Sequence, residues 1–351
     1  MAFSVIQVKK IDRGMCRLCQ EYCNLLTNVI VYTCKTVILR EDRRMILHDI
    51  IREIELELCT NNVKYNCGIE LNCGKNCNKC LVCDKQNEKN RRIILAYLNY
   101  TRKTPIAFER KVVYSRELKE KIRKKVIPAE EIKTLRYFEG KFRKGESIYY
   151  NLSKGIFDGC RQDVLLNSWH IYHIHLNMHE VMSKSGMDRN RADYLLFCII
   201  TDSQVLFIDV IPHPASPSDF VCLNFLQIIC DNNWNEEINL ERVKGAKNVT
   251  PKITDEEKLY EIMGKANLVF ELNGRVYIPL YGVVTSGHSQ VDVMRMDQFY
   301  KYIYDVNNTC QESIFIPDHE NNSILGRIEY YSSGKNHTST VLKDLRIGNN
   351  S

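Results

Sequence analysis

Apolar side chains recur three and four positions apart in four stretches of the chain, which is the spacing of one face of an amphipathic helix. The clearest stretches are residues 40–59 and 129–142, where isoleucine, leucine and phenylalanine keep this spacing among charged residues. A highly charged stretch at 116–127 and a Tyr- and Met-rich stretch at 292–306 follow the same pattern. We predict a helix in each, with the charged one ending before Pro128 because proline disfavours helical geometry in the residue before it.

Short apolar runs separated by turn residues predict two hairpins. YLLFCII and VLFIDVI are rich in β-branched and aromatic residues and flank the polar segment Thr201–Gln204, so we predict two antiparallel strands joined there. Farther along, Asn273-Gly274 separates NLVFEL from RVYIPLYGV. Asn-Gly is the strongest two-residue hairpin signal, and it predicts a second hairpin.

The region around the first hairpin also contains helix signals. DVLLNSWHIYHIHL, residues 163–176, changes from a helical to an extended pattern. Ser216-Pro217-Ser218-Asp219 predicts the start of a helix over FVCLNFLQIIC, because a capping serine, an early proline and a nearby carboxylate suit a first turn. Helices mixed with short antiparallel strands define the α+β fold class.

With 351 residues the chain is long enough for two or three domains. Changes in composition divide it into four predicted segments. These are a Cys-rich helical module at 1–90, a basic helical connector at 91–150, a compact α+β unit at 151–245 and an α+β extension with a polar tail at 246–351.

Charge and composition narrow the class of protein. The chain is 44% hydrophobic and 26% charged, as in ordinary globular proteins. It has no apolar run long enough to cross a bilayer and no signal-peptide pattern, so we expect a cytoplasmic protein without a membrane partner. The net charge of +6 is concentrated in residues 102–144, which carry fifteen Lys/Arg and six Asp/Glu with Tyr114, Tyr137 and Phe142 among them. Basic residues interleaved with aromatic ones predict contacts with RNA.

Ten of the fifteen cysteines lie in the first 90 residues. Cys-x-x-Cys spacing lets two sulfurs bind one ion from a tight turn, and two such pairs complete a tetrahedral zinc site. We therefore predict a structural zinc ion in the N-terminal module; reduced or disulfide-paired cysteines and an iron–sulfur cluster are the alternatives. The candidate metal ligands are Cys16, Cys19, Cys73, Cys77, Cys80 and Cys83.

A second candidate site lies between residues 170 and 213. In an extended strand alternate residues share a face, so His173 and His175 are predicted to point the same way. Arg189 and Arg191 follow, and His213 comes at the end of the first hairpin. Histidine serves as acid and base near neutral pH, and arginine binds phosphate through two hydrogen bonds. This combination suits cleavage of RNA by transesterification without any cofactor, with His173 or His175 as base and His213 as acid.

The order of these residues resembles a known family. His175-Leu176, then Arg191, a strand containing Phe197, a tight turn, a second strand and a terminal His213 are similar to the RelE/HigB-type toxins, within the wider group of barnase-, EndoU- and RelE-like ribonucleases. The resemblance covers about residues 160–215. It implies a small antiparallel sheet with helices on one side and metal-free RNA cleavage. It also implies a role as a toxin or defence effector, held in check by an antitoxin or inhibitor protein.

Two other hypotheses fit the same residues. In the first, His170, His173, His175 and His213, with Asp163 or Asp209, bind a metal ion for hydrolysis. In the second, the protein is a non-catalytic, zinc-containing adaptor for nucleic acid or protein, and the histidines and arginines belong to half-buried strands and solvated faces. An adaptor does not need His175 and His213 to come together, so their separation distinguishes the hypotheses.

Overall fold

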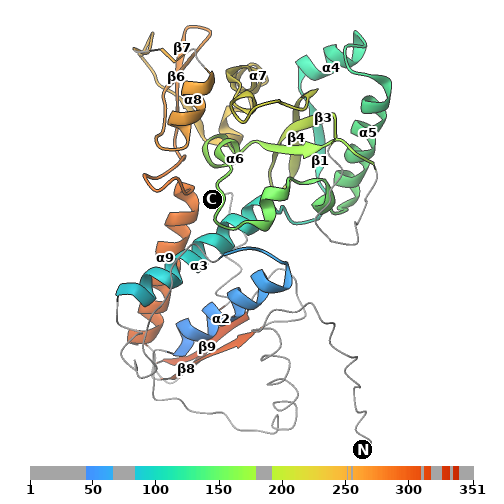
Figure 1. The fold of residues 1–351 in the computed structure, drawn as a ribbon. Helices are drawn as coiled ribbons and strands as arrows, with labels where there is room; N and C mark the ends of the chain where they lie inside the picture. Colours follow the sequence, from blue (N-terminus) through green and yellow to red (C-terminus); the bar gives the residue numbers. More distant parts are fainter. Residues whose placement is uncertain are drawn as a thin grey trace, which may run out of the picture.

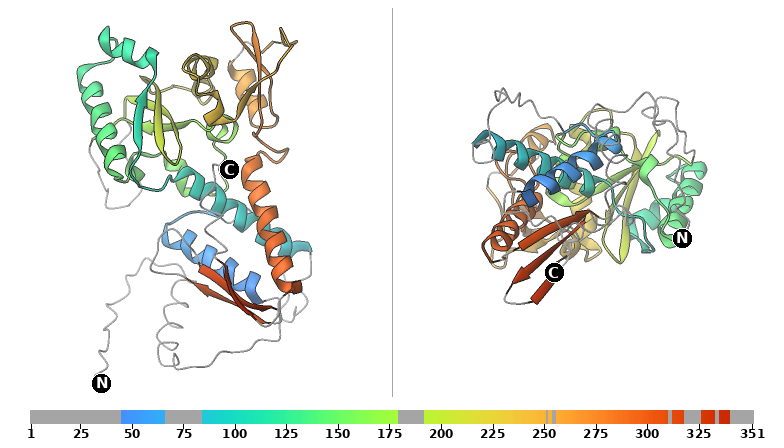
Figure 2. Two further views of the ribbon diagram at one scale, coloured as in Figure 1. Left: turned by 180° about the vertical axis from the view of Figure 1, so that it is seen from behind. Right: turned by 90° about the horizontal axis from the view of Figure 1, so that it is seen from below.

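The computed structural model describes residues 45–65, 84–178, 192–250, 252–253, 256–309, 312–317, 326–332 and 335–339. Within these residues the chain forms eight α-helices, one four-stranded sheet and two three-stranded sheets, which confirms the predicted α+β class. Figures 1 and 2 show the four-stranded sheet in one half of the molecule, a smaller sheet against a helix in the other half, and two long helices running between the halves.

Four strands form the central sheet: β1 (Lys111–Tyr114), β2 (Tyr172–His175), β3 (Tyr194–Ile200) and β4 (Gln204–Pro212). Their order is β1-β4-β3-β2. β3 and β4 are the predicted hairpin: they pair antiparallel, and the Thr201 amide donates to the Gln204 carbonyl over 2.9 Å. β2 pairs antiparallel with β3, so it forms one edge, and β1 pairs parallel with β4 at the other. The sequence pattern did not predict β1, which lies within the segment expected to be helical.

Both faces of the central sheet are buried. Leu196 and Cys198 of β3 pack in one core, and Leu195 and Phe197 pack in the other, because successive strand residues point to opposite faces. Helices cover each face, whereas the resemblance implied helices on one side only; an apolar side chain at every position of β3 requires cover on both sides. The first core includes α4 (Arg116–Arg123) and α5 (Ala129–Lys144), and the second includes α6 (Val164–Trp169) and α7 (Leu223–Asp231).

The helix predicted from Ser216 onward is divided in two. A short 3-10 helix, η3 (Ser218–Phe220), comes first, and α7 begins only at Leu223. Asp219 accepts a hydrogen bond from the Ser216 amide over 2.9 Å, and Val221 has extended backbone angles. The Ser-Pro-Ser-Asp signal therefore closes a local turn, as such side chains do in competition with helix formation.

The second predicted hairpin is confirmed. β6 (Phe270–Leu272) and β7 (Arg275–Pro279) pair antiparallel around Asn273 and Gly274, whose φ angles are 49° and 68°. Two successive positive φ angles are the geometry that makes Asn-Gly favourable in a two-residue turn. β5 (Leu240–Arg242) pairs with the other edge of β7.

The other half of the molecule has its own core, formed by three helices. α2 (Met45–Thr60), α3 (Asp84–Lys103) and α9 (Gln290–Thr309) bring together Ile54, Tyr97 and Phe299, among others. They come from three of the four segments recognised in the sequence. α2 also contacts β8 (Glu312–Pro317), which pairs with β9 (Gly326–Ser332), and β10 (Lys335–Ser339) completes that sheet. No helix in the described part of the chain has both the length and the apolar character needed to cross a bilayer.

Candidate functional site

The histidines of β2 lie at the edge of the central sheet. His173 is paired with Phe197 and His175 with Leu195. Since both partners face the core that includes α6 and α7, the two imidazoles point to that same side, as the alternation predicted. Their ring centroids are 6.3 Å apart.

His213 reaches the same place from β4. Its backbone amide donates to the Asp193 carbonyl over 2.7 Å, which holds the end of β4 beside the start of β3. Its ring centroid is 5.5 Å from that of His175, so the predicted convergence of His175 and His213 is found. The Nδ1 atom of His213 lies 2.8 Å from the Pro214 carbonyl. A carbonyl only accepts hydrogen bonds, so Nδ1 carries the proton and Nε2 of the neutral ring is free to accept one.

The ring of Phe220, in η3, packs against this group. Its centroid is 5.2 Å from that of His173 and 5.8 Å from that of His213, both in edge-to-face geometry. Phe220 is half-buried and belongs to the turn that replaced the start of the predicted helix. It therefore covers one side of His173 and His213, and all three histidines are only partly exposed.

Asp163 lies beside the first histidine. Its Oδ1 atom accepts from the Leu166 amide over 3.0 Å and so caps α6, while Oδ2 lies 3.9 Å from Nδ1 of His173. Burial lowers the pKa of His173, and the negative charge of Asp163 partly opposes that change. The ring is thus favoured in its neutral form near neutral pH, the form in which a base accepts a proton.

A cavity of about 180 Å³ opens beside His173. Lys103 and Arg161 line it together with Asp163 and Phe220. Lys103 is 5% exposed, and its ammonium donates to the carbonyls of Gly155, Asp158 and Arg161, so it fixes the loop that forms one wall.

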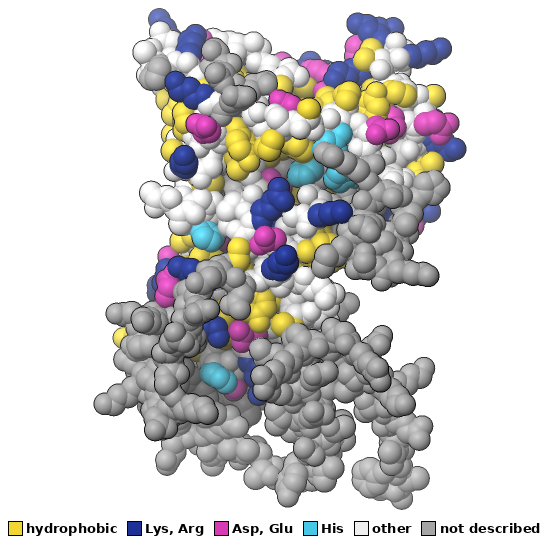
Figure 3. All heavy atoms as spheres, viewed as in Figure 1, with side chains coloured by type: hydrophobic (Ala, Val, Ile, Leu, Met, Phe, Trp, Pro, Cys, Tyr) yellow, Lys and Arg dark blue, Asp and Glu magenta, His cyan; other side chains and the backbone are white. Residues whose placement is uncertain are grey.

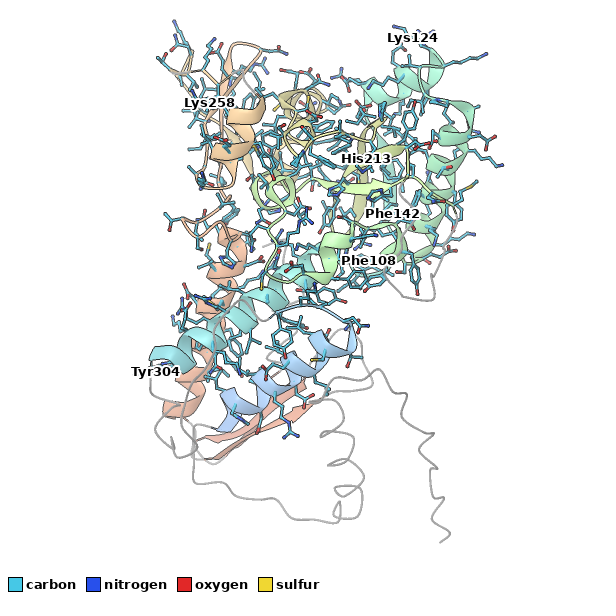
Figure 4. The ribbon with its side chains drawn as sticks, viewed as in Figure 1. Phe108, Lys124, Phe142, His213, Lys258 and Tyr304 are labelled. Carbon is cyan, nitrogen blue, oxygen red and sulfur yellow. The ribbon has the colours of Figure 1, made fainter. Side chains whose placement is uncertain are left out.

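The two basic residues of this wall, Lys103 and Arg161, differ in their exposure to solvent. Burial lowers the pKa of Lys103 to about 8, which is opposed by Asp163. Arg161 is exposed, and its side chain has no ion pair to any residue that the structure describes. Figure 3 shows histidine side chains gathered on this half of the molecule with Lys and Arg side chains nearby, and Figure 4 marks His213 beside the sheet.

The other predicted site residues are distributed differently. Arg189, Arg191 and the six candidate zinc ligands lie outside the described residues. His170, considered as a metal ligand, caps the end of α6 in a left-handed conformation and is buried close to Arg102. Asp209, considered for the same metal site, binds Lys121 at 2.6 Å instead.

The basic segment is partly neutralised by its own structure. Glu120 of α4 binds Arg123 and Lys124, so exposed cations of this helix are already paired. Lys121 supports the sheet, because Asp209 is 1% exposed and needs a counter-charge. Lys125, with a φ of 56°, lies in the turn that follows the helix. The helix end labelled at Lys124 in Figure 4 is therefore a surface of mixed charge.

The described cysteines and carboxylates give no ready metal centre. Cys59, Cys198, Cys222 and Cys230 are not in disulfide bonds, and Cys160 is disulfide-bonded. Among the residues that the structure describes, no three His, Cys, Asp or Glu side chains form a group that could hold a metal ion. Zinc in the N-terminal module stays a prediction, because its candidate ligands lie outside this part of the chain.

Sequence reasoning did not assign functional roles to Lys103, Arg161 or Phe220. Lys103 was counted only as one basic residue of the connector, and no residue close to it in the sequence links it to the histidines. Arg161 precedes Asp163 by two positions, and its closeness in sequence to the histidine strand was the one signal that could have indicated a role for it.

Comparison with models of protein families, with curated proteins and with solved structures found no match for this chain. The resemblance to RelE-like ribonucleases therefore remains a prediction.

Proposed function

We propose that this protein cleaves RNA by transesterification at the cavity beside β2. The observation that carries the proposal is the convergence of His173, His175 and His213, of which His173 lines a cavity with basic residues in its wall. An adaptor would not require this convergence. The proposal keeps the predicted histidine roles and adds the cavity as the place where the scissile phosphate binds.

His173 is the base in this proposal. It lines the cavity, and burial lowers its pKa, which keeps the ring neutral and able to accept the proton of the ribose 2′-hydroxyl. Asp163 lies 3.9 Å from Nδ1, so it favours a proton on that nitrogen and leaves Nε2 as the accepting atom. His175, between the other two rings, is placed to contact the phosphate.

His213 is the acid. Its Nδ1 proton is donated to the Pro214 carbonyl, which holds the ring in one orientation. As the acid, the ring carries a second proton on Nε2, and Nε2 is the atom that gives it up. The 2′-oxygen attacks phosphorus, the bond to the 5′-oxygen breaks, and His213 protonates that oxygen as it leaves. The products are a 2′,3′-cyclic phosphate and a 5′-hydroxyl end. General acid–base catalysis of this kind contributes about 100-fold to 10,000-fold for each group.

Positive charge for the phosphorane comes from the cavity wall. Arg161 is exposed and has the guanidinium geometry that suits phosphate oxygens. Lys103 donates its protons to three carbonyls, so it acts as a nearby charge rather than through a direct hydrogen bond. Arg189 and Arg191 keep the phosphate-binding role predicted for them. A role as a toxin or defence effector, restrained by an inhibitor protein, belongs to the same proposal.

The test is cleavage of a short RNA by the full chain in excess EDTA. We expect cleavage to persist and to leave a 2′,3′-cyclic phosphate, with no cutting of DNA or of RNA carrying a 2′-O-methyl group at the cut site. Cleavage that stops in EDTA and returns with added Zn²⁺ or Mn²⁺ would favour the histidine metal site instead. No cleavage of any RNA tested would overturn the proposal.

A further inference from the structure

A second cluster of charge lies on α3 and α9, apart from the histidines. The side chain of Arg102 is 3% exposed, and its Nε donates to Asp292 over 3.0 Å. Its Nη2 donates to Asn167 over 2.6 Å and to Asn99 over 3.1 Å. The remaining nitrogen, Nη1, is buried and has no hydrogen-bond partner among the described residues. A buried guanidinium with an unused donor is costly unless something else accepts from it.

Arg295, one turn along α9 from Asp292, adds another positive charge. It is half-buried, and the described part of the chain offers it no ion pair or hydrogen bond. Burial lowers its pKa, and Arg102 lowers it further while Asp292 acts in the opposite direction. Both guanidinium groups thus lie in the field of the Asp292 carboxylate, but only Arg102 is bonded to it.

The positive charge of these arginines also affects the pKa of two neighbouring histidines. Burial lowers the pKa of His170 to about 4, and Arg102 and Arg295 lower it further. Burial also lowers the pKa of His288, and the charge of Arg102 contributes while Asp292 opposes. Both rings are neutral near neutral pH, so neither adds charge, and the excess at the two arginines stays uncompensated.

These arginines border a pocket. A hollow of about 80 Å³ is lined by Arg102, Arg110 and Arg295, together with Tyr172 and the carboxylate of Asp202. Asp202 is exposed, so solvent screens its charge, while Arg102 and Arg110 are buried. The volume is that of several water molecules, which is the scale of one phosphate group.

We propose that the pocket lined by Arg102, Arg110 and Arg295 binds a phosphate group. A phosphate has the charge to balance the excess guanidinium and enough acceptor oxygens for several donors at once. The group belongs either to free phosphate or to the terminal phosphate of a nucleotide. The site is distinct from the histidine cavity and does not rest on the proposed catalytic function.

The experiment titrates the full chain with inorganic phosphate at constant ionic strength and follows binding by calorimetry and the thermal unfolding midpoint. We expect phosphate to bind and to raise the midpoint, and Arg295→Met to weaken binding about tenfold or more, because a charge-assisted contact is lost. Without phosphate, Arg295→Met is expected to unfold at a temperature no lower than the wild type, since it removes a repulsive charge.

Matched variants separate this pocket from other basic sites. Arg91→Met removes an exposed arginine of α3 that pairs with Asp297, and it should leave phosphate binding unchanged. Arg143→Met removes an exposed arginine of α5 that pairs with Glu139, and it should also leave phosphate binding unchanged. Equal binding by wild type and Arg295→Met would overturn the proposal, as would binding of acetate as tight as that of phosphate. Comparing 5′-AMP with adenosine then tells whether a nucleotide phosphate is accepted.

Discussion

The histidine cavity and the arginine pocket both border β2, and Tyr172 lines each of them. The two sites differ in whether their buried groups can become neutral. Beside the cavity, burial lowers the pKa of His173 and so favours its neutral form. In the pocket, the buried Arg102 cannot lose its proton and is paired with Asp292, while Arg110 and Arg295 add further positive charge. A group that titrates near neutral pH can shed its charge when buried, whereas a guanidinium must be compensated by its surroundings.

The largest effect expected concerns the cavity. His213→Ala and His173→Ala should each reduce the rate of RNA cleavage by about 100-fold to 10,000-fold, because each removes one proton-transfer group. Initial rates on a defined RNA measure this, with circular dichroism to check folding. His48→Ala changes an exposed histidine of α2 and should keep the wild-type rate. Rates that stay within a few-fold of wild type in both cavity variants would refute the assigned roles.

The next effect concerns stability in the pocket. Asp292→Asn leaves Arg102 buried without its carboxylate, so we expect a loss of about 3–5 kcal/mol in the free energy of unfolding. Asp297→Asn on the same helix breaks an exposed pair with Arg91 and should cost less than about 1 kcal/mol. Urea unfolding of both variants gives the comparison. Similar losses in the two variants would show that the buried Arg102–Asp292 pair contributes no more to the free energy of unfolding than the exposed pair does.

The pH dependence of stability should show a smaller effect from His170. Its pKa is about 4 in the folded protein and 6.5 when unperturbed. Between these values the unfolded chain binds the proton more readily, so this contribution is complete above pH 6.5 and is lost as pH falls toward 4. It amounts to at most about 3 kcal/mol.

The matched variant is His170→Asn, because asparagine tolerates the left-handed conformation that His170 adopts with a φ of 56°. Its free energy of unfolding should depend less steeply on pH than that of the wild type between pH 6.5 and 4. Identical slopes would show that His170 titrates normally and that the positive field of the arginines does not reach it.

The smallest expected effect tests the role of Asp163. Asp163→Asn keeps a side chain that can cap α6 and removes the negative charge beside His173. The pKa of His173 should fall further, because the charge that opposed its decrease is gone. The acid limb of the pH–rate profile is then expected to move to lower pH, with a stability change below about 1 kcal/mol. An unmoved limb would place the titrating base elsewhere.

Local patterns were sufficient for much of the architecture. The β3–β4 hairpin and the Asn273-Gly274 turn were predicted because a few adjacent residues determine strand propensity and turn geometry. The shared face of His173 and His175 follows from strand alternation alone. The division of the helix after Ser216 was missed, because Ser216 and Asp219 can either cap a helix or close a turn, and the sequence does not distinguish these outcomes.

The sequence by itself determined several of the helices, the two hairpins and the two histidines that share one face, since these depend on neighbours within a few positions. Only the tertiary structure decided that β1 joins the central sheet and that His213 meets His175. It also brought Lys103 to the histidine cavity and Arg295 beside Arg102. These contacts join residues far apart in the chain. They arise because apolar surfaces on both faces of the sheet and on α2, α3 and α9 are buried together, and that burial carries the charged residues with it.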